Sequence, residues 1–159
     1  MDRKHIAPGD VLTQIMTTVF RVNSLLLDKG DQLVAPLGMT SARWQVMGAI
    51  ALSGRALSCP QIAAAMGLTR QGAQKQLNQA QRDGLIAAQE NPRHERSPLY
   101  ELTDAGRCSY NAAIASEEVW AKALAKTMTQ PDLEIALNVL ETLAARLQST
   151  PLPVASSNP

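Results

Sequence analysis

The sequence has few of the residues that build chemical sites. Its 159 residues include two cysteines, two histidines and five aromatic side chains. Cys59 and Cys108 lie far apart and form no CxxC pair, which leaves little material for a zinc site. The glycines form neither a GxGxxG nor a GxxxxGK pattern, and no nucleophile with a base is evident. The sequence therefore argues against an enzyme and predicts no catalytic residue, no metal site and no cofactor.

Long hydrophobic runs are also missing. Polar and charged residues interrupt the most hydrophobic stretch at Gln14, Arg21, Asn23 and Asp28. No segment approaches the roughly 18 apolar residues of a membrane span. Residues 1–5 lack the apolar stretch and the cleavage site of a secretory signal. We therefore expect a cytoplasmic protein without membrane contact, whose thiols stay reduced.

Charge is unevenly distributed along a chain whose formal net charge is +1. Residues 40–100 carry seven basic and three acidic side chains. Residues 1–39 are balanced, and residues 101–159 carry four basic and seven acidic side chains. This distribution indicates that the basic middle of the chain binds a polyanion and that the neutral and acidic ends form a scaffold that does not contact it.

Hydrophobic periodicity and capping residues predict a mainly helical chain with one small β-hairpin. The first helix should run from Asp10 to about Val34, and its apolar residues occupy more than one face, so we expect it to be largely covered. Later helices are expected from Thr40 or Ser41 to Ser53, from Ser58 to Gly67, from Thr69 to Gly84, from Thr103 or Asp104 through Leu124, and from Pro131 through Leu147. Two strands, Leu85–Glu90 and Leu99–Leu102, should flank a polar loop.

The two helices around Gly67 have the pattern of a helix-turn-helix, whose second helix lies in the DNA major groove. Ala73, Leu77 and Ala80 form the only apolar stripe of that second helix. Its polar side chains suit base edges and phosphates. The candidate contacts to DNA are Thr69, Arg70, Gln71, Gln74, Lys75 and Asn78. A solvated surface helix remains the alternative interpretation.

The hairpin that follows strengthens the DNA-binding interpretation. Its loop carries Arg93, His94 and Arg96, which suit backbone phosphates or a narrow minor groove. A basic hairpin beside a recognition helix makes a winged helix-turn-helix. A plain exposed turn whose charges serve solubility is the alternative.

Three segments together resemble the MarR family of winged-helix transcriptional regulators. They are Arg70 to Ile86, the loop Asn91-Pro92-Arg93-His94-Glu95-Arg96-Ser97, and Leu102-Thr103-Asp104-Ala105-Gly106, which leads into a long helix. The resemblance covers roughly residues 10–148. It implies a homodimer that binds a double-stranded, pseudo-palindromic DNA operator. It also implies, for many members, a repressor that a small, often aromatic, ligand releases.

The resemblance assigns roles to individual residues. Gln74 and Lys75 stand where the family commonly has Thr and Arg on the recognition helix, and Arg96 stands at the wing arginine that enters the minor groove. His94 departs from the family, which usually has Asp there to hold that arginine. Imidazole does not reproduce the charge-assisted hydrogen bond of a carboxylate, so either the wing is positioned differently or His94 contacts phosphate.

The helical ends carry more apolar surface than a small winged helix can cover, which independently indicates a homodimer. We therefore divide the chain into an N-terminal dimerisation helix (10–38), a winged helix-turn-helix DNA-binding lobe (39–102), C-terminal dimerisation helices (103–148) and a disordered tail (149–159).

The resemblance also implies a ligand pocket where the first two helices, the long fifth helix and the DNA-binding lobe meet. Its candidate residues are Met16, Phe20, Arg43, Trp44, Met47 and Tyr110. Core packing is the alternative for the Trp and Met residues. Arg43 suits an aromatic carboxylate or, equally, a DNA phosphate.

Two further functions compete with ligand-controlled DNA binding. One is a helical protein-interaction adaptor whose winged helix does not bind DNA. The other is redox sensing by Cys59, because its place in the first turn of a helix is expected to lower the thiol pKa. Against redox sensing, we expect both Cys59 and Cys108 to be buried structural thiols.

Overall fold

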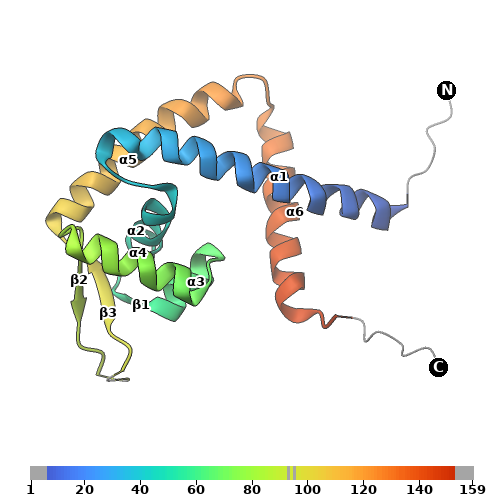
Figure 1. Ribbon diagram of the computed structural model, residues 1–159. Helices are drawn as coiled ribbons and strands as arrows, with labels where there is room; N and C mark the ends of the chain where they lie inside the picture. The colour runs from blue at the N-terminus through green and yellow to red at the C-terminus, as the bar shows by residue number, and fades with distance from the viewer. Residues whose placement is uncertain (1–6, 93, 95, 153–159) are drawn as a thin grey trace. The chain divides into compact units, whose positions relative to one another are not determined.

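The computed structural model describes residues 7–92, 94 and 96–152. Within these residues the chain forms six α-helices, one 3-10 turn and a three-stranded antiparallel sheet (Figure 1). The predicted class, mainly α with a small β wing, is confirmed. Two compact units divide the chain after residue 117, so that α5 begins in the first unit and ends in the second.

Apart from η1 and β1, which the sequence did not predict, the elements of the first unit follow the predicted order. They are α1 (Pro8–Val34), η1 (Ala35–Leu37), α2 (Ser41–Ser53), β1 (Leu57–Ser58), α3 (Cys59–Met66), α4 (Arg70–Arg82), β2 (Ile86–Gln89), β3 (Leu99–Leu102) and the start of α5 (Asp104–Ala125). The rest of α5 and α6 (Gln130–Ser149) form the second unit. The part of the tail predicted to be disordered that lies in 153–159 is outside the described residues.

Capping residues set the helix boundaries as the sequence predicts. Thr40 and Thr69 are the N-caps of α2 and α4, and their hydroxyl oxygens accept from the backbone N–H groups three residues later. Gly67 and Gly84 follow α3 and α4 with φ of 63° and 70°. This left-handed backbone suits glycine, which has no Cβ to clash.

The sheet contains one strand that the sequence analysis missed. The strand order is β1-β3-β2, and Tyr100 on the central strand β3 is paired with Leu57 on one side and Ala88 on the other. β1 has only two residues, too few for an alternating pattern to reveal. Its pairing completes the sheet beside the hairpin.

The hydrophobic core lies in the first unit. Its largest fully buried side chains come from α1, α2, α3, α4 and β2, namely Val34, Val46, Met47, Ile62, Leu77 and Ile86. The buried residues on β3 alternate, with Tyr100 and Leu102 inward and Glu101 outward. In this way one core fixes α4 against the base of the hairpin.

The first helix is not covered within one chain, contrary to the expectation from its apolar faces. Only Gly30 and Val34 of α1 are buried, and Phe20 is 75% exposed. In the second unit α6 has no buried residue at all. Its exposed apolar side chains are Leu133, Ile135, Leu137, Val139, Leu140 and Leu147. Both helices therefore present apolar surface that a single chain leaves in solvent.

A tight backbone junction joins the end of α4 to the start of α5. Thr103 donates from its hydroxyl to the Gly84 carbonyl at 2.7 Å and from its N–H to the Leu85 carbonyl at 3.1 Å. The same hydroxyl accepts from the Gly106 N–H at 3.0 Å. Gly106 packs directly on the Leu85 carbonyl, where a Cβ would collide with backbone. This contact explains why the Leu-Thr-x-x-Gly pattern has glycine at its end.

We expect Gly106→Ala to lower the free energy of unfolding by about 1–3 kcal/mol, because the added methyl group must displace the backbone at Leu85. Urea denaturation measures the change. Gly9→Ala is the control, since a Cβ at Gly9 meets nothing within 4 Å. Equal midpoints for Gly106→Ala and the unmodified protein would contradict the junction described here.

Candidate nucleic-acid interface

Helix α4 turns a polar face outward because a narrow stripe of small apolar residues holds its inner face. Ala73, Leu77 and Ala80 are fully buried, which confirms the predicted stripe. Of the six candidate contacts on this helix and its cap, five are exposed: Thr69, Arg70, Gln71, Lys75 and Asn78. They form a surface of amides, one hydroxyl and two cations with no acidic side chain among them.

Gln74 is the sixth candidate, and the structure gives it internal partners. Its side chain is half-buried, and its Nε2 donates to the Tyr100 hydroxyl at 3.0 Å and to Asn78 Oδ1 at 2.8 Å. Tyr100 is 3% exposed. Sequence reasoning missed Tyr100, although an inward position on a strand next to α4 is the signal that could have found it.

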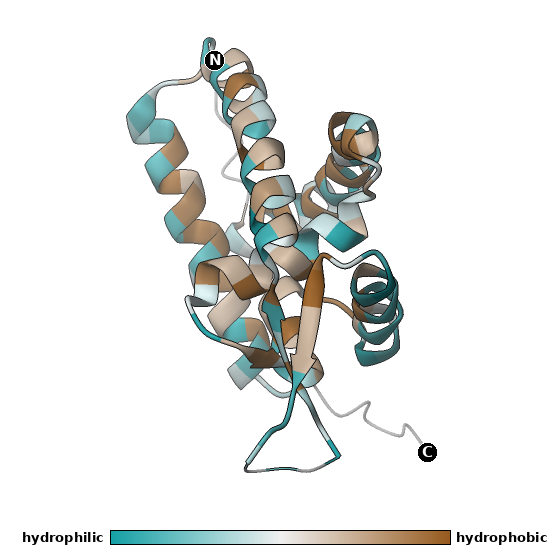
Figure 2. Ribbon diagram, turned by 90° about the vertical axis from the view of Figure 1, so that its left-hand side faces the viewer, coloured by the Kyte–Doolittle hydropathy of each residue, from teal (hydrophilic) through white to brown (hydrophobic). Residues whose placement is uncertain are grey.

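Backbone and amide hydrogen bonds shape the wing loop between β2 and β3. The His94 N–H donates to the Asn91 carbonyl and the Ser97 N–H donates to the His94 carbonyl, both at 2.9 Å. Asn91 Nδ2 also donates to the Ser97 carbonyl at 2.8 Å. His94 and Arg96 are exposed, whereas Arg93 lies outside the described residues. The described part of the loop is hydrophilic (Figure 2).

Arg43 is mostly buried, and its guanidinium bonds to other parts of the protein. Its Nη1 lies 2.8 Å from Asp83 Oδ2 and donates to the Gly38 carbonyl at 3.2 Å. The Arg43 side chain is 13% exposed, the Asp83 side chain is 35% exposed, and the buried Arg43 Nε has no hydrogen-bond partner among the described residues. The ion pair therefore ties the start of α2 to the C-cap of α4.

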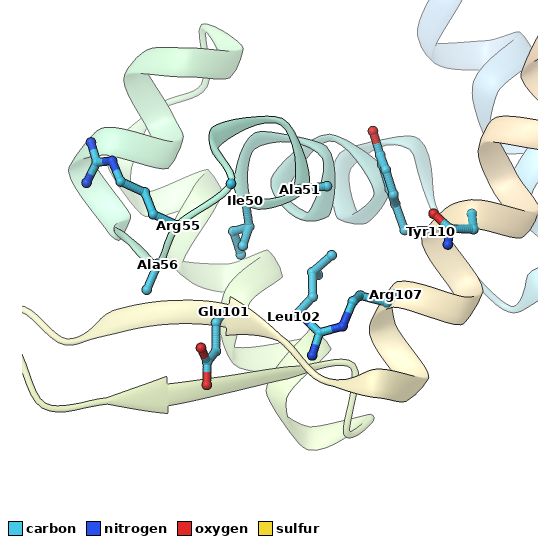
Figure 3. A pocket seen from close by; sticks show the side chains of 10 residues that line it. Ile50, Ala51, Arg55, Ala56, Glu101, Leu102, Arg107 and Tyr110 are labelled. Atoms are coloured by element: carbon cyan, nitrogen blue, oxygen red, sulfur yellow. The ribbon is translucent and has the colours of Figure 1, made fainter.

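The candidate pocket residues are dispersed in the structure. Met47 is fully buried in the core, Trp44 packs partly buried against it, and Met16 and Phe20 are exposed on α1. Tyr110 alone of the six lines a hollow of about 410 Å³, between the end of α2, β3 and the start of α5 (Figure 3).

The hollow has an apolar floor and polar walls. Its lining includes Ile50 and Leu102, with Arg55, Glu101 and Arg107 among the charged side chains. Burial, with a smaller effect of the Glu117 carboxylate, raises the pKa of Tyr110, which keeps this phenol protonated at neutral pH.

The two cysteines differ from expectation in different ways. Cys59 is buried, as predicted, but burial raises its thiol pKa in spite of the opposing effect of Arg70, so the expected lowering by the helix terminus is wrong. Its Sγ donates to the Arg70 carbonyl at 3.5 Å. Cys108 is exposed, so the prediction that it is buried is wrong.

Two absences apply to the part of the chain that the structure describes. None of its helices is long and apolar enough to cross a membrane. It also contains no group of three or more His, Cys, Asp or Glu side chains that could hold a metal ion.

Comparison with known proteins identifies the family. Residues 37–97 match a family model described as MarR family. The uncharacterized protein Rv2011c of Mycobacterium tuberculosis (strain ATCC 25618 / H37Rv) is 39% identical over 99 residues, which are 62% of this chain and 68% of that protein. The chain belongs to the MarR family, and the resemblance predicted from its motifs is confirmed.

Solved structures share the fold over most of the chain. The transcriptional regulator BldR from Sulfolobus solfataricus has a TM-score of 0.80 at 15% identity, covering 89% of this chain and 99% of that chain. A mutant MarR from E. coli complexed with operator DNA has a TM-score of 0.72 at 15% identity, covering 87% and 99%. The protein therefore has the winged-helix fold of MarR-family transcription regulators.

We expect Asp83→Ala to lower the free energy of unfolding by about 1–3 kcal/mol, because it leaves the largely buried Arg43 guanidinium with one carbonyl partner. Chemical denaturation monitored by circular dichroism checks this. Glu118→Ala is the matched control, since it removes an exposed ion pair with Lys122 and should change stability by less than about 1 kcal/mol. An equal decrease in the free energy of unfolding in both variants would show that the Arg43–Asp83 pair stabilises the protein no more than the exposed Lys122–Glu118 pair does.

Proposed function

We propose that the protein is a homodimeric, sequence-specific transcription regulator that binds a pseudo-palindromic operator and acts as a repressor released by a small ligand. The observation that carries the proposal is the exposed face of α4, which is polar and basic and is flanked by a hydrophilic wing loop that carries Arg96. The solved complex of a MarR mutant with operator DNA, whose fold is similar, supports it.

In the proposed complex α4 enters the major groove and the wing reaches the adjacent backbone or minor groove. Arg70 and Lys75 at the N-terminal half of α4, together with Arg96 of the wing, supply positive charge for phosphates. The exposed amides of Gln71 and Asn78 are suited to base edges. Affinity then comes mainly from the cations and specificity mainly from the amides.

The homodimer in this proposal is supported by the apolar side chains that α1 and α6 leave exposed. Several exposed apolar side chains on one helix are typical of association sites. Two-fold symmetry would place two recognition helices about 34–36 Å apart, so half-sites should be centred about 10 bp apart.

Release by a ligand is the part of the proposal that concerns regulation. The hollow lined by Tyr110 has the apolar floor and the guanidinium of Arg107 that suit an aromatic acid. Arg107 lies on the first turn of α5 after Thr103, which is bonded to the end of α4. A ligand seated there would therefore act next to the junction that positions the recognition helix.

We expect Lys75→Ala and Arg96→Ala each to weaken operator binding and to lower the slope of log affinity against log salt by about one, because each removes one phosphate contact. Fluorescence anisotropy on the DNA upstream of the protein's gene and on a scrambled duplex measures both quantities. Lys126→Ala, which removes an exposed cation of the second unit, should leave affinity and slope unchanged.

Equal, weak binding of the unmodified protein to the upstream and scrambled duplexes, followed by failure to select any sequence from a random pool, would contradict sequence-specific DNA binding. The protein-interaction adaptor would then be the better interpretation.

We expect Leu137→Asp to convert the dimer into monomers and to reduce operator affinity at least tenfold, because burying a leucine side chain contributes about 1.5–3 kcal/mol and a buried unpaired carboxylate costs more. Light scattering after size-exclusion chromatography measures the mass. Leu52→Asp is the control and should remain dimeric. It also places a carboxylate on an exposed leucine, 78% exposed against 58% for Leu137, but Leu52 lies at the end of α2, outside the proposed dimer interface. A monomeric unmodified protein, or a dimeric Leu137→Asp variant, would contradict this interface.

A further inference from the structure

Hydrogen bonds within the protein orient the side-chain amide of Gln74 in the absence of DNA. An amide NH₂ group has two hydrogens and no acceptor capacity, and the amide oxygen only accepts. Both hydrogens of Gln74 Nε2 are engaged, one by the Tyr100 hydroxyl at 3.0 Å and the other by Asn78 Oδ1 at 2.8 Å. Among the described residues Gln74 Oε1 has no hydrogen-bond partner, so the acceptor is the only function that this amide has left.

Tyr100 is the buried partner in this arrangement. It lies on β3, the central strand of the sheet, with 3% of its surface exposed. Because the ring is packed in the core, its hydroxyl stays at a fixed place beside α4. Turning the Gln74 amide over would place Oε1 against both partners, so the Tyr100 hydroxyl would have to donate instead of accept and the Asn78 amide would have to turn over as well.

An acceptor-only glutamine cannot recognise adenine in the usual bidentate way. That pairing needs the amide oxygen to accept from adenine N6 and the amide nitrogen to donate to N7. In the major groove, adenine N6 and cytosine N4 are the exocyclic donors, whereas guanine and thymine present acceptors at O6, N7 and O4. An amide that only accepts therefore separates amino bases from keto bases.

We propose that Tyr100 is a specificity-determining positioning residue, which fixes the Gln74 amide as an acceptor so that the protein reads an amino base, adenine or cytosine, at one position of each half-site. This inference rests on the proposed operator binding. Asn78 takes the complementary role, because its Oδ1 is occupied and its exposed Nδ2 is left to donate.

The test starts from the operator selected from a random pool by the unmodified protein. Gln74→Ala identifies the position that Gln74 reads, since discrimination is lost there and kept elsewhere. Four duplexes that differ only at this position are then compared by competition anisotropy. We expect those with adenine and cytosine to bind within about threefold of each other, and those with guanine and thymine to bind about tenfold or more weakly.

Tyr100→Phe removes only the hydroxyl that holds the amide. It frees one hydrogen of Nε2 for adenine N7, so adenine should now be preferred over cytosine by about fivefold or more. Gln130→Ala, which removes a glutamine of α6 whose amide bonds the exposed Glu134, should keep the original pattern. Gln74→Glu, whose carboxylate only accepts, should also keep adenine and cytosine above guanine and thymine, and it provides the test if Tyr100→Phe fails to fold.

The outcomes separate this inference from the function on which it depends. Failure to select any operator overturns the proposed function and the inference together. Specific binding overturns the inference alone in three cases: if Gln74→Ala alters discrimination nowhere, if adenine alone or a keto base is preferred, or if the pattern of Tyr100→Phe matches that of the unmodified protein.

Discussion

The position of α4, the helix proposed to enter the major groove, depends on the junction between its C-terminal turn and the first turn of α5. At this junction the side chain and N–H of Thr103 bind two successive carbonyls, and Gly106 lies so close to the second of them that a Cβ would collide with it. Because Thr103 and Gly106 both meet backbone atoms of residues 84 and 85, the start of α5 and the end of α4 are held together at this point.

The first unit buries many of its apolar side chains, whereas α6 buries none. The first unit has a core of its own, which extends from Val34 to Ala113. Helix α6 has apolar residues at helical spacing but buries none of them. One part of the chain therefore has a packed core of its own, whereas α6 leaves its apolar side chains exposed.

The sequence could predict the helices and the hairpin because their signals are local. Thr40, Thr69, Gly67 and Gly84 act within one helical turn, so reading the chain in short windows is enough to find them. β1 could not be found in this way, because a two-residue strand exists only through its pairing with β3.

The candidate site was predictable only in part. The outward face of α4 follows from the inward stripe of Ala73, Leu77 and Ala80. The partners of the polar residues do not follow, because Tyr100 is 26 residues from Gln74 in the chain and Asp83 meets Arg43 across the fold. Cys59 shows the same limit: its place at a helix start was predictable, but the burial that raises its thiol pKa was not.

In the wing loop, the groups that close the turn are different from the side chains that are candidates for DNA contact. Its turn is closed by main-chain hydrogen bonds and by the Asn91 amide, and none of these bonds uses the side chain at position 94 or 96. His94 therefore stands, with no need for the loop to be rebuilt, at the position where the resemblance leads us to expect an aspartate. A single substitution at position 94 or 96 can change the charge of this loop and leave these bonds in place, so the charge of the wing is adjustable independently of its turn.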